Sequence, residues 1–278
     1  MRLQVIIPKI NHLPPSPQVL PKLQRMLHDP CADSSEVMDL IRADSSLTAE
    51  LLRLSNSATY ARVDPVTSLD SAINLLGFKQ IYRAAAQVIC KQSLGSDLPL
   101  YNLKKNALLQ QSICAACVME EFAAVSSLDR SMAYTLGLLH VCGKVVVQYA
   151  WNLKYLPLPT VPPTPEVEKQ QVSFNYAEAG AALMQFWKFP EEIGLIIKAH
   201  VAPESSYVEL IQATHLHLAA GVAPYLLQKE EARKHIPNTA LFRSAKITAN
   251  EWEAILTAAQ PKAVDVLKNT CGITAKGA

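Results

Sequence analysis

The chain has 278 residues, of which 50% are hydrophobic and 18% are charged, and this composition excludes a disordered protein. Its 26 Lys and Arg residues nearly balance its 24 Asp and Glu residues, so it lacks the strongly basic surface of a general nucleic-acid or anionic-membrane binder. Only nine glycines and an aromatic content of 6%, with long runs of helix-forming residues, predict an all-α fold.

The N-terminal segment does not resemble a secretory signal. Its apolar stretch of Val5, Ile6 and Ile7 ends at Pro8, and is much shorter than the apolar core of such a signal. We therefore expect a cytoplasmic protein whose six cysteines remain reduced thiols.

The first third of the chain predicts a bundle of short helices. Apolar residues recur with helical spacing over residues 19–27, and Asp33 and Asp44 are suitable N-caps for the next two helices. Ser68 can cap a fourth helix that ends at Gly77, because glycine readily adopts the left-handed conformation that closes a helix. Asn56 is either a recognition residue or, as we predict, a residue that closes a helix by bonding to its own backbone.

Two longer, largely buried helices are predicted at 106–122 and 131–151. The first contains Cys114 and Cys117, and together with His140 and Cys142 these residues could supply four zinc ligands. However, the segment is dense in Ala and Leu and shows neither the βαβ context of a redox CxxC nor a second zinc knuckle. The pattern therefore favours buried free thiols.

A proline-rich segment divides the second half of the chain. Residues 155–165 contain five prolines, so we predict an ordered loop or a semi-rigid connector there instead of a helix. Loops of this kind often carry binding residues, and the loop is a candidate interaction surface.

Further helices are predicted after this loop. One covers about 176–187, one opens at Pro190, and a long one covers about 205–227. The last is nearly long enough to span a bilayer, but its polar residues and its proline indicate a buried helix. Beyond residue 229, the apolar residues Trp252, Ile255 and Leu256 predict helices on the flank of the domain.

Several separated segments carry a resemblance to a known family. In chain order they read LPPSP (13–17), IRAD (41–44), LTAELLRLSNSA (47–58), GLLHVCGK (137–144), AEAGAAL (177–183) and LHLA (216–219). Together they resemble the HDOD family, the HD-related output domains of bacterial signalling proteins. The resemblance implies an HD-like helical domain preceded by a bundle of short helices. We expect an N-terminal lobe at 1–104, a degenerate HD-like lobe at 105–228 and C-terminal flanking helices at 229–278.

The distantly related HD phosphohydrolases hold a divalent metal through a His, a His-Asp pair and a later Asp, and the metal activates a bound water. On that pattern, Gln111 stands at the first His, His140 and Val141 stand at the His-Asp pair, and Ala220 stands at the final Asp. Three of the four ligands are therefore missing. Tyr176 also stands where many HDOD sequences have another His.

The periodicity of the apolar residues predicts that these positions face inward. Val141 and Ala220 stand where the HD pattern has carboxylates, and this replacement would convert a charged metal site into an apolar, packed part of the core. We predict that His140 is a hydrogen-bonded core histidine, with Gln111 as one candidate partner. The candidate vestigial pocket comprises Gln111, His140, Val141, Tyr176, His200 and Ala220.

Other polar residues receive structural interpretations. His215 and His217 are two residues apart and cannot face the same side of a helix, which argues against a shared metal. The small basic clusters at 104–105 and 233–235 are predicted to be solvated faces.

The leading hypothesis is a non-catalytic signalling or regulatory module, without a metal or cofactor, that binds signalling proteins or a nucleotide-like small ligand. One alternative is a metal-dependent phosphohydrolase acting on nucleotides or cyclic dinucleotides through unrecognised ligands. A third is a pseudoenzyme that binds nucleotides without turnover. Neither nucleic acid nor a membrane is expected as a partner, and the sequence leaves the oligomeric state open.

Overall fold

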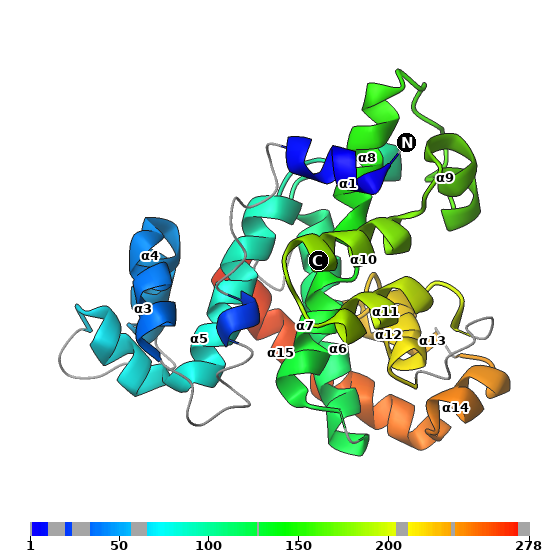
Figure 1. Cartoon of the computed structure of the whole chain (residues 1–278). Helices are drawn as coiled ribbons and strands as arrows, with labels where there is room; N and C mark the ends of the chain where they lie inside the picture. Colours follow the sequence, from blue (N-terminus) through cyan, green and yellow to red (C-terminus); the bar gives the residue numbers. More distant parts are fainter. Residues whose placement is uncertain are drawn as a thin grey trace. The chain divides into compact units, whose positions relative to one another are not determined.

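The structure is a computed structural model that describes residues 2–10, 20–23, 34–56, 66–126, 128–203, 211–234 and 237–271. The predicted all-α fold is confirmed: the described residues form helices joined by turns and loops, with no β-strand among them (Figure 1). Their single extended pairing is an isolated bridge between Leu98 and Leu103. The LPPSP motif, the predicted cap Asp33 and most of the predicted helix at 19–27 lie outside the described residues.

The chain divides into two compact units, which are described separately. One unit is Pro14–Cys90, and the other combines Met1–Leu13 with Lys91–Ala278. The first unit contains α3 (Ser34–Ala43), α4 (Ser45–Ser55) and most of α5 (Leu69–Leu94). The three-part division at residues 104 and 228 stays a prediction.

The caps predicted in the first unit at Asp44 and Ser68 are confirmed. Asp44 Oδ1 accepts the backbone N–H of Leu47 at 3.0 Å, and Ser68 Oγ accepts that of Ser71 at 3.1 Å. Side-chain oxygens at these positions satisfy N–H groups that have no partner within the helix.

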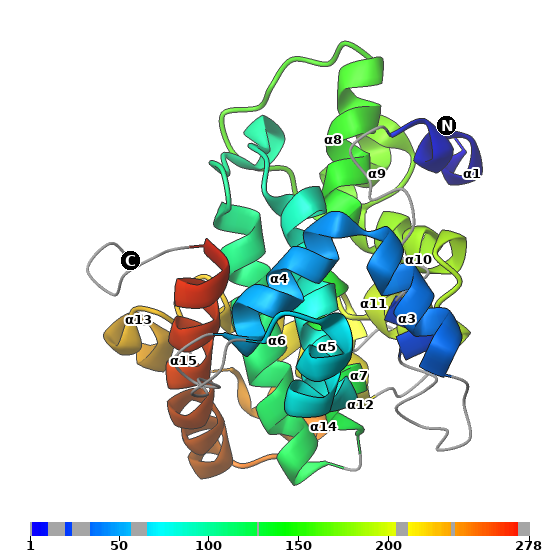
Figure 2. The ribbon, with the colours of Figure 1, turned by 90° about the vertical axis from the view of Figure 1, so that its left-hand side faces the viewer.

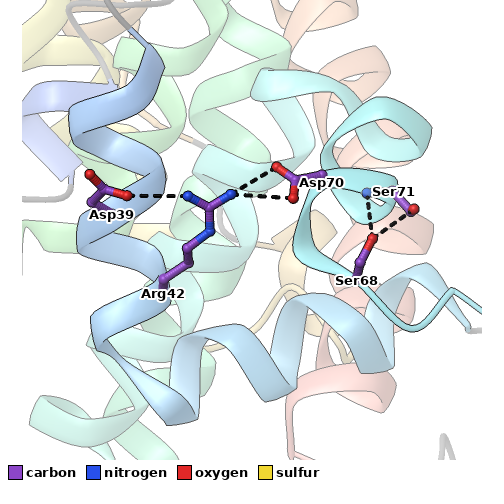
Figure 3. A network of polar contacts seen from close by, with 5 residues as sticks. All are labelled: Asp39, Arg42, Ser68, Asp70 and Ser71. Carbon is purple, nitrogen blue, oxygen red and sulfur yellow. Dashed lines mark hydrogen bonds and ion pairs between the residues drawn. The ribbon is translucent and has the colours of Figure 1, made fainter.

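Arg42 links α3 to the first turn of α5. Its guanidinium contacts Asp39 at 3.2 Å and both oxygens of Asp70 at 3.0 and 3.2 Å (Figure 3). The three side chains are about half exposed or more, so water screens their attraction. One nitrogen, Nη2, makes both contacts with Asp70, so this exposed ion pair adds little to the stability of the fold.

Helix α5 differs from its prediction at Gly77. The helix predicted to stop there resumes after it and continues to Leu94. Gly77 itself is not helical, with φ 72° and ψ 158°, so the expected break in the backbone is present as a kink. Glycine tolerates this conformation because it has no Cβ.

The second unit is assembled around α6 (Ala107–Val125), whose predicted position is confirmed. Helices α7, α12 and α15 pack against α6, while α10 packs against α8 and α11 (Figures 1 and 2). The α-helices that lie wholly within this unit are α1 (Leu3–Ile6), α6, α7 (Arg130–Leu139), α8 (Gly143–Leu153), α9 (Pro165–Val172), α10 (Tyr176–Phe186), α11 (Glu191–Ala199), α12 (Ile211–Val222), α13 (Lys229–Lys234), α14 (Thr239–Ala245) and α15 (Ala249–Cys271). Helix α6 is long and apolar enough to cross a membrane, but 78% of its most apolar window is buried inside the protein, as expected of a core helix.

Two helices after the proline-rich loop follow their predictions, and one is shorter. Helices α10 and α11 begin as expected, whereas α12 ends at Val222 and the chain turns at 223–227. Pro224 explains the early end, because the residue before a proline disfavours the helical conformation. The C-terminal helix α15 buries Trp252, Ile255 and Leu256, and it packs directly on α6.

Candidate functional site

His140 lies at the junction of two helices. The single helix predicted at 131–151 was wrong: α7 ends at Leu139 and α8 begins at Gly143. Residues 140–142 between them form a tight turn. In it the Cys142 N–H donates to Leu139 O at 3.0 Å, and the Lys144 N–H donates to Val141 O at 2.9 Å. His140 is therefore held by a tight turn between two helices.

Glycines on either side of this turn allow the backbones to approach closely. A Cβ on Gly137 would lie 2.4 Å from Ala116 Cα in α6, and a Cβ on Gly143 would lie 1.9 Å from Tyr176 O in α10. Each glycine therefore sets the contact of one helix with a different neighbour. The GLLHVCGK motif thus has a packing role that does not depend on a metal.

Two buried histidines meet behind this turn. His140 is 3% exposed and donates from Nδ1 to Gly137 O at 2.6 Å, which confirms a hydrogen-bonded core histidine. His200 is 1% exposed and donates from Nδ1 to Ile197 O at 2.5 Å. Their ring centroids are 5.5 Å apart with an interplanar angle of 88°. Because a carbonyl oxygen only accepts, each ring carries its proton on Nδ1, and Nε2 presents a lone pair.

Tyr176 forms a hydrogen bond with the unprotonated nitrogen of His200. Its hydroxyl lies 3.2 Å from His200 Nε2 and donates to it. Tyr176 is the first residue of α10, whose start is fixed by a capping box between Asn175 and Glu178. The beginning of this helix therefore places a hydrogen-bond donor against the histidine.

Both histidines are neutral at physiological pH. Burial, together with repulsion from His200 and Lys144, holds the pKa of His140 well below its ordinary value. Burial lowers the pKa of His200 to about 4, with smaller contributions from His217 and Lys144.

A second group adjoins the histidines, and we call it the Lys144 cluster: Tyr101, Lys144, Glu168 and Tyr176. Tyr101 and Glu168 are buried, and Lys144 and Tyr176 are half-buried. The Lys144 ammonium lies 5.1 Å from the ring centres of both Tyr101 and Tyr176. Glu168 is fully buried; it accepts the Tyr101 hydroxyl and the Tyr176 backbone N–H, each at 2.6 Å. A cation held over two aromatic rings and next to a carboxylate is stabilised without a metal.

Burial is the largest cause of the pKa shifts in this cluster. Desolvation raises the pKa of Glu168 to about 7, although its hydrogen bonds and Lys144 act in the opposite direction. Desolvation lowers the pKa of Lys144, while the attraction of Glu168 raises it. Burial also raises the pKa values of Tyr101 and Tyr176, so both hydroxyls stay protonated and remain donors.

The other predicted positions contribute no ligand atoms to the histidine pair. Val141 is buried, whereas Gln111 and Ala220 are only half-buried, so the inward orientation predicted for these two is correct only in part. His140 bonds to Gly137 rather than to its suggested partner Gln111.

These residues do not fit the divalent metal of the HD phosphohydrolases. Val141 and Ala220 have no donor atoms, the His200 lone pair is taken by a tyrosine hydroxyl, and Lys144 repels a cation from both histidines. Within the described part of the chain, no three His, Cys, Asp or Glu side chains gather in a way that could hold a metal ion.

Other residues highlighted by the sequence have structural contacts. Asn56 closes α4 through Leu52 O at 2.8 Å and pairs with the backbone of Val66, as predicted for a helix-closing residue. His215 bonds to Ala245 O and His217 bonds to His200 O, so the two point to different neighbours. Cys114 and Cys117 are buried, and burial raises the pKa of the Cys114 thiol to about 12.

Sequence reasoning missed Tyr101 and Glu168, and it quoted Lys144 only as part of a motif. No helix was predicted at α9, and its sequence, PEVEKQQV, has the composition of a polar surface helix in which nothing local marks one carboxylate as buried. The one available signal was the Lys that follows Gly143, since a lysine inside a buried motif needs a partner.

Comparison with known proteins identifies the family. Residues 13–203, more than half of the chain, match the HDOD domain model. The chain belongs to the HDOD family. A Treponema pallidum (strain Nichols) protein, named only as uncharacterised, is 26% identical over 203 residues. The match covers 70% of this chain but 39% of that protein, so this chain spans well under half of its relative's length.

Solved structures share the HDOD fold. An HDOD domain protein of unknown function from Geobacter sulfurreducens matches with a TM-score of 0.65 and 18% identity, over 97% of this chain and 95% of that one. A Marinobacter aquaeolei VT8 protein, provisionally named a signal transduction protein, matches with a TM-score of 0.69 and 19% identity. The match covers 93% of this chain and 60% of that one. A Shewanella amazonensis SB2B protein, provisionally named a phosphohydrolase, matches with a TM-score of 0.63 and 20% identity. The match covers 95% of this chain and 94% of that one. At these identities the likeness establishes the fold alone.

Proposed function

We propose that this HDOD chain is a non-catalytic regulatory module that acts in the cytoplasm by binding signalling proteins or a nucleotide-like small ligand. One observation carries the proposal. At the place of the HD metal site, the His200 lone pair is engaged by Tyr176 and the neighbouring positive charge is the protein's own Lys144. The residues there offer no set of ligands for a metal ion that would activate a water molecule.

The retained part of the HD-like motif supports this proposal. Gly137 and Gly143 fit close backbone contacts, and His140 bonds within its own turn. These residues maintain the packing of α7 and α8 whether or not a metal binds. The signalling name of the Marinobacter neighbour agrees with a regulatory role, while the phosphohydrolase name of the Shewanella neighbour represents the alternative.

An activity assay separates the two functions. The purified chain is incubated with Mn²⁺, Fe²⁺ or Mg²⁺ and with nucleotides, cyclic dinucleotides and a chromogenic phosphate ester. We expect no turnover above that of the His140→Ala variant. Metal-dependent hydrolysis that His140→Ala abolishes would establish the phosphohydrolase instead. A thermal-shift series with the same nucleotides tests the pseudoenzyme, since a ligand that binds only the folded state raises its melting temperature.

A further inference from the structure

The loop between α8 and α9 exposes several apolar side chains. Tyr155 is 95% exposed, Leu158 is 54% exposed and Val161 is 72% exposed. Pro157, Thr160 and Pro162 beside them are also exposed, whereas Leu156, Pro159 and Pro163 are half-buried. Most of the loop therefore faces solvent, with apolar side chains spread along it.

Tyr155 at the start of the loop has a left-handed backbone with φ 53°, so a polyproline II segment can begin only after it. Prolines at five of the positions 157–165 fix φ near the polyproline II value, and each disfavours the α conformation in the residue before it. Among the described residues, no backbone–backbone hydrogen bond involves positions 157–163, as is typical of polyproline II. The chain bends at 160–161, and Thr164 at its end has φ −75° and ψ 163°.

The loop is held in place from its inner side. Trp151 Nε1 donates to Pro157 O at 3.1 Å, and Asn102 Nδ2 donates to Thr160 O at 3.4 Å. Both views show it as an arch that leaves the end of α8 and returns to α9 (Figures 1 and 2). An anchored, proline-restricted loop loses little conformational entropy when a partner binds it.

We propose that this loop, residues 155–163, is a docking ridge for a protein partner with a groove lined by aromatic side chains. Such grooves bind preformed polyproline II segments, and the loop offers apolar side chains without a single charge between positions 155 and 165. A lipid surface fits less well, because the loop has no cluster of basic residues and its unpaired backbone groups would be desolvated. The proposal rests on the proposed partner-binding function and names the surface that serves it.

Site-specific photocrosslinking tests this surface. A benzoylphenylalanine replaces Leu158 in the full chain, expressed in the cells that naturally contain it, and the matched control carries the same group at the exposed Phe186 of α10. We expect a discrete adduct at 158 alone, joined to a partner peptide that contains aromatic residues. A synthetic peptide of residues 155–165 should compete with it. The Tyr155→Ser/Leu158→Ser/Val161→Ser variant should bind the purified partner about tenfold more weakly or worse, as expected for loss of interface anchors.

Other outcomes overturn the proposal. These are no adduct at 158, equal adducts at 158 and 186, an adduct with a second copy of this chain, or an adduct with a partner surface that lacks aromatic residues. Binding of the chain to phosphatidylglycerol vesicles that the triple variant loses would assign the loop to a membrane. Circular dichroism melting confirms that each variant folds. None of these readouts measures metal or hydrolysis, so failure of the docking ridge leaves the non-catalytic function to its own test.

Discussion

The Tyr176 hydroxyl donates a hydrogen bond to His200 Nε2 at 3.2 Å, while His200 Nδ1 donates to Ile197 O. Both nitrogens of this histidine are therefore engaged within the protein. A histidine that binds a metal needs one free lone pair, and in His200 a tyrosine at the start of α10 takes it. The hydrogen bond converts a ligand-like residue into part of the core.

Tyr176→Phe removes this hydrogen bond and keeps the ring that faces Lys144. We expect the free energy of unfolding in urea to fall by about 1–2 kcal/mol, because the buried His200 nitrogen loses its donor. Tyr155→Phe, at a 95% exposed tyrosine, is the matched control and should leave stability unchanged. Equal stability of Tyr176→Phe and the native chain would show that the hydrogen bond does not contribute.

Glu168→Gln tests the buried carboxylate. The pKa of Glu168 is raised from 4.5 to about 7, so over this range the folded state keeps a proton that the unfolded state has released. Stability from this group therefore falls as the pH rises from 4.5 to 7, by an amount on the order of 3 kcal/mol. The unfolding free energy of the native chain should fall by that amount relative to Glu168→Gln.

Urea denaturation from pH 4.5 to 8 measures this difference, and Glu192→Gln at an exposed carboxylate provides the baseline. A native-minus-variant difference that stays constant or rises with pH would contradict a raised pKa of Glu168.

Gly137→Ala tests the close approach of α6 and α7. The added methyl would lie 2.4 Å from Ala116 Cα, so the two backbones must separate. We expect a loss of about 3 kcal/mol or a failure to fold. Gly194→Ala is the matched control, because its methyl would come no closer than 3.4 Å and alanine favours the helix by about 1 kcal/mol. A tolerated Gly137→Ala would contradict the packing role of the motif.

The helices were predictable where local signals and packing agree. Asp44, Ser68 and the capping residues of α10 lie where the sequence predicts helix starts. The break at residues 140–142 was not predictable from periodicity, because α7 and α8 both continue the apolar pattern. It depends on which neighbours Gly137 and Gly143 approach, and this information is not local.

The candidate site was predictable in part for the same reason. Family resemblance identified His140, Tyr176 and His200, which do come together. Glu168 lies in a segment with the composition of a surface helix, and only the fold brings it under Tyr101. The local sequence therefore does not reveal that one carboxylate of a polar helix is buried.

Buried histidines should make the protein labile to acid. Burial lowers the pKa values of His140, His200 and His215, so the unfolded state binds protons first as the pH falls below 6.5. Stability is therefore present above pH 6.5 and is lost as the pH falls through the lowered values. Because Glu168 acts in the opposite direction, the cleanest measurement uses the Glu168→Gln background.

His215→Phe in that background isolates one of these contributions. Phenylalanine can keep the stacking on Phe122, now at 4.3 Å, and it removes a buried Nδ1 that has no hydrogen-bond partner. At pH 7 we expect a change within about 1 kcal/mol, since the bond to Ala245 O is also lost. Between pH 7 and 5 the variant should lose less stability than its parent, and an identical loss would contradict a lowered pKa of His215.

The metal content of the purified chain tests the non-catalytic function most directly. The protein is incubated in turn with Mn²⁺, Fe²⁺, Zn²⁺ and Ni²⁺, freed of unbound ions, and measured by inductively coupled plasma mass spectrometry beside His140→Ala. Because His200 is engaged by Tyr176 and Lys144 lies close by, we expect well under one ion per chain and no difference between the two proteins. One tightly bound ion per chain that His140→Ala releases would contradict this function.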